Sequence, residues 1–189
     1  SLRTAYERGM WPTVVAYSQM LTDAWFARGH LSDARQGYQW AAEAAEALED
    51  HEAYASSLIQ WGQACIEQGD YDEAEKRLSS SLQFCKGTGY QTGAASAQFF
   101  LGRLAIERAD YDQAQLLLEE SMRARERLGD RLGTAEALYQ MASIPYYRQN
   151  FERAEYLLKQ AAAIQKALGD KSGHIRTLRR FADATLARG

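Results

Sequence analysis

The side chains best able to bind a metal or to act as nucleophiles are three histidines and two cysteines. His30, His51 and His174 lie far apart in the sequence, as do Cys65 and Cys85. A zinc site places its ligands at short spacings such as Cys-x-x-Cys or His-x-x-x-His, and neither occurs here. We therefore expect no metal site, and we expect the histidines to lie on the surface or at helix starts.

Acidic pairs and glycine-rich loops are the next candidates for catalysis. Glu119-Glu120 and the pair Asp70 and Asp72 fall where solvated helix faces or helix caps are expected. The sequence contains neither a glycine-rich phosphate loop nor a nucleophile elbow. We expect no enzyme activity and no cofactor in this segment.

Composition and charge argue against two kinds of ligand. Lys+Arg 22 against Asp+Glu 25 gives a net charge of -3 with both signs interspersed, so no basic stripe is available for a nucleic-acid backbone. No uninterrupted apolar stretch approaches the roughly 18 residues of a membrane span, and no signal peptide is visible. With only 2 prolines and 14 glycines, the chain is expected to be all-α, with neither nucleic acid nor membrane as a direct ligand.

The elements that must position any site repeat every forty residues. Each copy has a turn, an aromatic residue or leucine, an alanine three residues further on, and an apolar residue four positions after that alanine. Spacings of three and four residues place the apolar positions on one helical face. The anchor alanines are Ala34, Ala74, Ala114 and Ala154.

A second kind of turn reads Leu128-Gly129-Asp130 and Leu168-Gly169-Asp170, in which glycine can end one helix and aspartate can cap the next. The first copy has Glu49-Asp50 without the glycine, and the second has Gly87-Thr88-Gly89, which predicts a looser turn without the aspartate. Both kinds of turn together predict helices near 12–28, 31–48, 51–68, 71–86, 91–108, 111–128, 131–148, 151–168 and 171–187, with residues 1–9 as the last turns of a preceding hairpin.

The two cysteines fall on neighbouring predicted helices. Cys65 lies about one turn before the turn at Gly69 and Cys85 several turns after it, which at about 1.5 Å per residue separates them by on the order of 15 Å. A disulfide cannot span that distance. Two free thiols favour a reducing compartment, and we expect a cytoplasmic location.

Stacked helix hairpins of this kind predict an α-solenoid, a superhelix of antiparallel hairpins. We expect one repeat domain over 1–189 with repeats at approximately 12–50, 51–90, 91–130 and 131–170, followed by an unpaired or capping helix at 171–187. The sequence opens with Ser1, and the period runs to both ends, so we expect the chain to be part of a longer multidomain protein.

The repeat resembles the tetratricopeptide repeat, whose signature places a tryptophan, a leucine, a glycine and then an alanine at fixed intervals. The best copy carries Leu58, Trp61, Gly62 and Cys65, followed by Ala74 and Leu78. The period is 40 rather than about 34 residues, and the closing proline is absent. The resemblance implies an interaction module for a protein or peptide.

Copies carrying Leu-Gly-Asp-x-x-Gly, as at 128–133, resemble the arrays of kinesin light chains and the sensor arrays of bacterial signalling ATPases and maltose-activator-type transcription regulators. The second likeness implies that the array senses an inducer or partner and regulates a neighbouring nucleotide-binding module. The partner could then be an adjacent domain of the same chain.

The first helix of each hairpin is expected to line the concave face of such an array. Forty-residue ladders on those helices place apolar and aromatic side chains beside polar ones, as in a peptide groove. Burial between repeats would require a similar apolar arc, so packing remains the alternative for each residue. The candidate partner-binding residues are Phe26, Ile59, Gln63, Ile66, Phe99, Arg103, Ile106, Tyr139, Tyr146 and Arg179.

Two functions remain open: a sensor that binds a peptide, partner domain or inducer on this face, or an architectural spacer or self-assembly surface without a separate ligand. The sensor requires exposed groove aromatics, and the spacer requires buried ones. Family members that bind a chaperone's C-terminal carboxylate present lysine, arginine and asparagine in the polar row. Here that row offers Asp23, Gln63 and Ser143, with only Arg103 and Arg179 cationic, so we do not expect a carboxylate clamp. The oligomeric state stays open.

Pro145 falls inside the predicted helix 131–148. It removes one amide donor and crowds the carbonyl of Met141. Either the helix tolerates a distortion near its end, or a kink re-aims Tyr146 and Tyr147 toward the groove.

Overall fold

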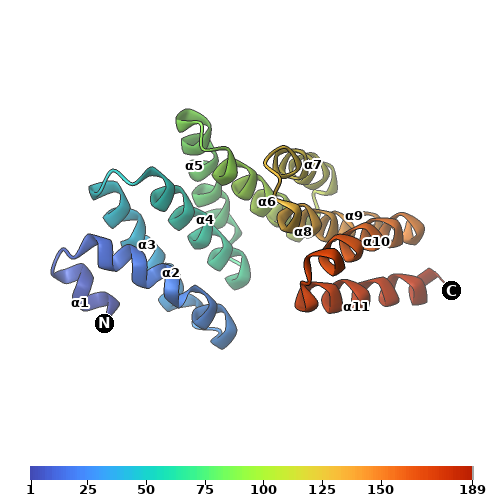
Figure 1. Ribbon diagram of the computed structural model, residues 1–189, viewed down its shortest axis with the longest axis horizontal. Coiled ribbons are helices and arrows are strands. Elements are labelled where there is room, and N and C mark those ends of the chain that lie inside the picture. The colour runs from blue at the N-terminus through green and yellow to red at the C-terminus, as the bar shows by residue number, and fades with distance from the viewer. Residues whose placement is uncertain (189) are drawn as a thin grey trace. The chain divides into compact units, whose positions relative to one another are not determined.

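The computed structural model describes residues 1–188, which form helices joined by short turns, with no strand among them (Figure 1). All nine predicted helices are present, with one divided in two, and a short helix precedes them. The helices are α1 (Leu2–Glu7), α2 (Trp11–Arg28), α3 (Leu31–Ala47), α4 (His51–Gln68), α5 (Tyr71–Thr88), α6 (Gln91–Glu107), α7 (Tyr111–Arg127), α8 (Arg131–Met141), α9 (Ser143–Tyr147), α10 (Phe151–Leu168) and α11 (Lys171–Arg188).

The chain divides into two compact units, Ser1–Phe100 (unit 1) and Leu101–Gly189 (unit 2), and helix α6 contributes residues to both. In unit 1, α2 packs on α3, α3 on α4 and α4 on α5. In unit 2, α7 packs on α8, and α10 packs on both α8 and α11. Each unit is therefore built from consecutive helix hairpins, and the expectation of one repeat domain over 1–189 stays a prediction.

Apart from the break between α8 and α9, every helix boundary within the array falls on a twenty-residue register. The residue that ends each segment has a positive φ, and the amide that follows it donates to the carbonyl five residues earlier, as when Asp70 N donates to Cys65 O at 2.9 Å. This is the Schellman arrangement, which satisfies carbonyls left free at a helix end. The positive-φ residues are Gly9, Gly29, Glu49, Gly69, Gly89, Ala109, Gly129, Gln149 and Gly169.

The residue after most of these positions caps the next helix. Its side-chain oxygen accepts a hydrogen bond from the amide three residues further on, for example Asp130 from the Gly133 amide at 2.8 Å. The six side-chain caps of this kind are Asp50, Asp70, Asp110, Asp130, Asn150 and Asp170. A pair of neighbouring residues, the positive-φ residue and the capping residue after it, therefore ends one helix and begins the next.

Two turns differ from the sequence expectation. The expectation of a looser turn over Gly87-Thr88-Gly89 was wrong, since α5 continues through Gly87 to Thr88 and ends normally at Gly89, with φ 75°. Glu49 adopts φ 55° although it carries a Cβ, so the twenty-residue register holds there without a glycine.

Small residues allow the helices of each hairpin to approach closely. The anchor alanines are fully buried, as are Leu78, Leu118 and Leu158, which follow three of them by four residues. A Cβ added to Gly62 would lie 2.5 Å from Leu78 Cγ, and one added to Gly102 would lie 2.7 Å from Leu118 Cγ. Gly62 and Gly102 therefore lie where the two helices of a hairpin approach most closely.

The helix predicted over 131–148 is interrupted at Ala142. Helix α8 ends at Met141, and α9 begins at Ser143. Because Pro145 has no amide hydrogen, it cannot donate to the carbonyl of Met141, which lies four residues earlier. The predicted distortion at Pro145 is therefore confirmed as a break in the helix.

Candidate partner-binding groove

The structure places the ten candidate residues in three different environments. Ile59, Ile66 and Phe99 are only 5%, 6% and 6% exposed, so packing explains them and they present little surface to a ligand. Arg179 is exposed. The other six are half-buried: Phe26, Gln63, Arg103, Ile106, Tyr139 and Tyr146.

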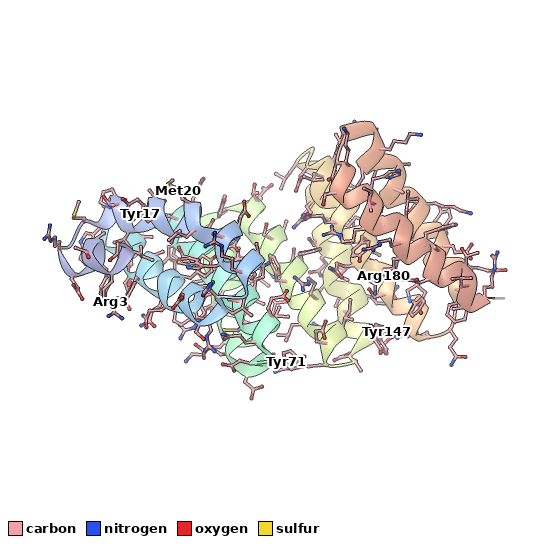
Figure 2. The ribbon with its side chains drawn as sticks, turned by 90° about the horizontal axis from the view of Figure 1, so that it is seen from below. Arg3, Tyr17, Met20, Tyr71, Tyr147 and Arg180 are labelled. Atoms are coloured by element: carbon pink, nitrogen blue, oxygen red, sulfur yellow. The ribbon has the colours of Figure 1, made fainter. Side chains whose placement is uncertain are left out.

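Three of the candidates come together in unit 2. Tyr139 of α8, Tyr146 of α9 and Arg179 of α11 line one open groove of about 660 Å³. Helix α11 adds Arg176, Arg180, Ala182 and Asp183 to the lining. Figure 2 labels Arg180 among these side chains. We call this surface the tyrosine–arginine groove.

Cationic side chains surround the Tyr139 ring. The guanidinium carbon of Arg176 lies 4.9 Å from the ring centroid, and that of Arg180 lies 5.1 Å from it. Both distances suit a cation–π contact. The two arginines are four residues apart, so they share one face of α11 and reach the same ring.

Tyr146 is held at the groove by other aromatic rings. Its centroid lies 5.6 Å from that of Phe151 and 5.9 Å from that of Tyr147, both in edge-on geometry. Tyr147 does not line the groove; it stacks on Tyr111 at 5.7 Å. Of the two tyrosines that follow Pro145, only Tyr146 contributes to this surface.

The groove carries excess positive charge. Arg176, Arg179 and Arg180 line it with one carboxylate, Asp183, and none of the three arginines has an ion-pair partner among residues 1–188. The whole chain has a net charge of -3. The groove is thus a local basic surface on an acidic chain, suited to a ligand with negative charge.

A family comparison identifies the repeat. The family model described as tetratricopeptide repeat matches residues 54–127 and 93–167, which together span more than half of the chain. The chain belongs to the tetratricopeptide repeat family. No curated protein matches it.

Solved structures of repeat proteins share the fold at low sequence identity. BtubC (BKLC) from P. vanneervenii has a TM-score of 0.69 and 17% identity, covering 98% of this chain and 85% of its own. A putative kinesin light chain from Podosopora anserina has a TM-score of 0.68 and 17% identity, with 96% and 87% covered. A signal transduction ATPase with numerous domains, PH0952 from Pyrococcus horikoshii, has a TM-score of 0.66 and 18% identity, covering 92% of this chain and 26% of its own.

These matches confirm the all-α, α-solenoid class of antiparallel hairpins that the forty-residue period predicts. Tetratricopeptide repeats are typically non-catalytic scaffolds, and the fold supports a protein–protein interaction module. None of the described helices has the length and apolar character needed to cross a membrane.

A hollow in unit 1 of this repeat protein has different chemistry. Its volume is about 290 Å³, and it is lined mainly by hydroxyl and amide side chains, together with the carboxylate of Asp23. Tyr38 donates to Thr22 Oγ1 at 3.0 Å, and burial raises the pKa of its phenol. No cationic side chain lines this hollow, so it does not extend the basic surface.

Histidines and cysteines have structural surroundings in the repeat. His30 Nδ1 lies 3.5 Å from Asp33 Oδ2. The centroid of the His51 ring lies 5.5 Å from that of the Phe84 ring, in edge-on geometry. Residues 1–188 contain no group of three or more histidine, cysteine, aspartate or glutamate side chains that could hold a metal. Both thiols are buried and free, and burial raises the pKa of Cys65 to about 11.

Two groove residues, Arg176 and Arg180, were missed in the sequence because they lie outside the forty-residue ladders, which took in Arg179 of the same helix but neither of these two. Their signal was present in the printed sequence, since Arg176, Arg179 and Arg180 lie within five residues on one amphipathic helix. A three- or four-residue spacing of arginines beside a tyrosine ladder position would have indicated the same surface.

Proposed function

We propose that this chain is a protein-interaction module that binds an acidic peptide segment of a partner in the tyrosine–arginine groove. The observation that carries the proposal is the set of three arginines without an ion-pair partner among residues 1–188, two of which lie on Tyr139. Arginine can form bidentate hydrogen bonds with a carboxylate, and a half-exposed tyrosine adds contact area at small entropic cost.

Exposure separates this function from the architectural alternative. Tyr139 and Tyr146 keep part of their surface open to solvent, as a sensor requires. The burial of Ile59, Ile66 and Phe99 is what an architectural spacer requires, and it favours that role for those positions. The two functions therefore make different predictions for unit 2, where the spacer has no need of unpaired arginines.

The wider role is that of a sensor controlling a neighbouring module. The similar chain PH0952 is described as a signal transduction ATPase with a tetratricopeptide repeat sensor, and the present chain spans 26% of it. In the same way, binding of an acidic segment to the groove would regulate a multidomain signalling ATPase or transcription regulator. The segment belongs to a partner protein or to an adjacent domain of the same chain.

Binding of a designed peptide tests the groove. The probe is a fluorescein-labelled peptide, Glu-Glu-Phe-Glu-Glu, compared with its Gln-Gln-Phe-Gln-Gln counterpart by fluorescence anisotropy. Wild-type chain should bind the acidic peptide more tightly, and added salt should weaken that binding because it screens exposed charges. The Arg176→Gln/Arg180→Gln variant should lose about tenfold in affinity, since two charge-assisted contacts disappear.

A matched charge control separates the groove from the general surface. Arg127→Gln/Arg131→Gln removes two exposed arginines of unit 2 that do not line the groove. This control should bind the acidic peptide as the wild type does. Equal loss in both variants, or equal binding of the two peptides, would contradict the proposal and leave the architectural role.

A further inference from the structure

A pocket lies on unit 2 away from the tyrosine–arginine groove, at the place where Pro145 breaks the helix. Its volume is about 320 Å³, within the range of about 300 to 1,000 Å³ usual for small-ligand pockets. Met141, Ile144, Pro145 and Leu157 supply apolar lining, and none of these four residues lines the groove. We call it the Pro145 pocket.

The repeat provides an internal comparison eighty residues earlier, in unit 1. There Trp61 stands at the position of Met141, and Arg77 stands at the position of Leu157. The guanidinium carbon of Arg77 lies 3.8 Å from the centroid of the Trp61 ring, and the indole is buried. Unit 1 therefore has an aromatic ring at the position where unit 2 has the thinner Met141 side chain, and a hollow of about 280 Å³ remains beside that ring.

One of the equivalent positions carries opposite charges in the two units. In unit 1 Glu73 Oε1 lies 2.6 Å from Arg77 Nη2, so the chain supplies ring, cation and carboxylate together. In unit 2 the residue at the position of Glu73 is Arg153, which lines the Pro145 pocket. Unit 2 thus keeps a cation and lacks the ring and the carboxylate.

The other charges around the pocket are already paired. Arg148 Nη2 donates to Asp112 Oδ1 at 2.6 Å, and Glu119 Oε2 accepts from Arg123 at 3.2 Å. Arg153 has no carboxylate partner among residues 1–188; its guanidinium carbon lies 5.2 Å from the Tyr156 ring. The unbalanced charge at the pocket is therefore positive.

We infer that the Pro145 pocket binds an aromatic group that carries a carboxylate. The ring, of about indole size, lies against Met141, Ile144 and Leu157. The carboxylate pairs with Arg153, the one lining arginine that lacks a carboxylate partner. Such a group could be a free aromatic acid or an aromatic residue next to an acidic one in a peptide.

Three small probes separate ring binding from charge recognition. Indole-3-acetate carries ring and carboxylate, indole carries the ring alone, and tryptamine carries the ring with a positive charge. Methyl-labelled methionine NMR reads the pocket directly, because Met141 lines it while Met10 and Met20 are exposed in unit 1. The Met141 methyl should show a saturable shift, tightest for indole-3-acetate and weakest for tryptamine.

Variants test the two halves of the site. Met141→Trp places in unit 2 the residue that unit 1 has there and removes the Met141 reporter, so binding is read at the Met122 methyl, which lines the adjacent surface together with Met141 and Leu157. The shift that indole-3-acetate causes at Met122 in the wild type should be lost in this variant, because the larger ring narrows the Pro145 pocket. Arg153→Gln should weaken indole-3-acetate by about two- to fivefold and leave indole unchanged, as removal of one exposed ion pair predicts. Arg131→Gln, an exposed arginine outside the pocket, should leave both unchanged.

A peptide arm identifies the source of the ligand, using N-acetyl-Trp-Glu-amide. Tighter binding than indole-3-acetate supports a peptide partner, and weaker binding supports a free aromatic acid. The Arg176→Gln/Arg180→Gln variant should bind every probe as the wild type does, so this site can stand or fall independently of the groove. No shift at Met141, or parallel shifts at Met10 and Met20, would overturn the inference.

Discussion

Three helix ends in the array hold a residue with a Cβ in the left-handed region. Glu49, Ala109 and Gln149 have φ of 55°, 58° and 60°, at register positions where six other segments have glycine. A side chain in this conformation costs about 1 to 2 kcal/mol because Cβ approaches the following carbonyl oxygen. Each of these sites should therefore gain from substitution by glycine.

The gain is smaller than the strain because glycine makes the unfolded chain more flexible. That entropy term costs about 0.5 to 1 kcal/mol, so Ala109→Gly should raise the free energy of unfolding by about 0.5 to 1 kcal/mol. The three sites lie in separate turns, and their effects should add to about 1.5 to 3 kcal/mol. For a chain of this length the triple variant should melt about 3 to 12 °C higher.

The reverse substitution isolates the backbone term. A Cβ added to Gly129 meets nothing within 4 Å, so Gly129→Ala has no steric clash and only the cost of φ 73°. It should lower the free energy of unfolding by about 1 kcal/mol. Urea unfolding followed by circular dichroism measures both variants. A neutral Gly129→Ala together with a destabilising Ala109→Gly would refute the reasoning.

Three further predictions concern the core. Gln165 is fully buried with neither amide atom hydrogen-bonded, so Gln165→Met should raise the free energy of unfolding by about 1 kcal/mol, and a loss in urea unfolding would mean that the amide is satisfied. Gly62→Ala should lower the free energy of unfolding by about 1 to 3 kcal/mol because the added Cβ meets Leu78. Gly87→Ala, inside a helix with open space around it, should raise the free energy of unfolding by about 0.5 to 1 kcal/mol in the same assay. Burial raises the Cys65 pKa from 9.0 to about 11, so the free energy of unfolding should fall as pH rises from about 9, where the unfolded thiol ionises, to about 11. Cys65→Ala should flatten this part of the pH profile of melting temperature, and an unchanged profile would contradict the prediction.

The sequence predicts the fold well because each local signal agrees with the repeat. The glycine at a helix end, the aspartate that follows it and the alanine four residues later recur together, so a wrong assignment in one copy is corrected by the others. The exceptions are local. Gly87 and Gly89 were both candidates for the end of α5, and the helix ends at Gly89, the position that fits the twenty-residue register.

The candidate site could be predicted only in part. A ladder position that touches solvent in one repeat is buried in another, as Phe99 and Tyr139 show, and one sequence does not reveal which neighbours cover it. Tyr139, Tyr146 and Arg179 share one groove as the ladders suggested. Arg176 and Arg180 were missed because their contacts with the Tyr139 ring of α8 depend on how the helices pack, which their positions in the sequence do not reveal.

Photocrosslinking tests the proposed function most directly. The acidic peptide Glu-Glu-Phe-Glu-Glu, with its phenylalanine replaced by benzoyl-phenylalanine, is irradiated with the wild-type chain, and the attached fragment is found by mass spectrometry. Binding in the tyrosine–arginine groove predicts crosslinks within 139–147 and 176–183, and their loss in Arg176→Gln/Arg180→Gln. Crosslinks confined to other segments, or unchanged in that variant, would contradict the account.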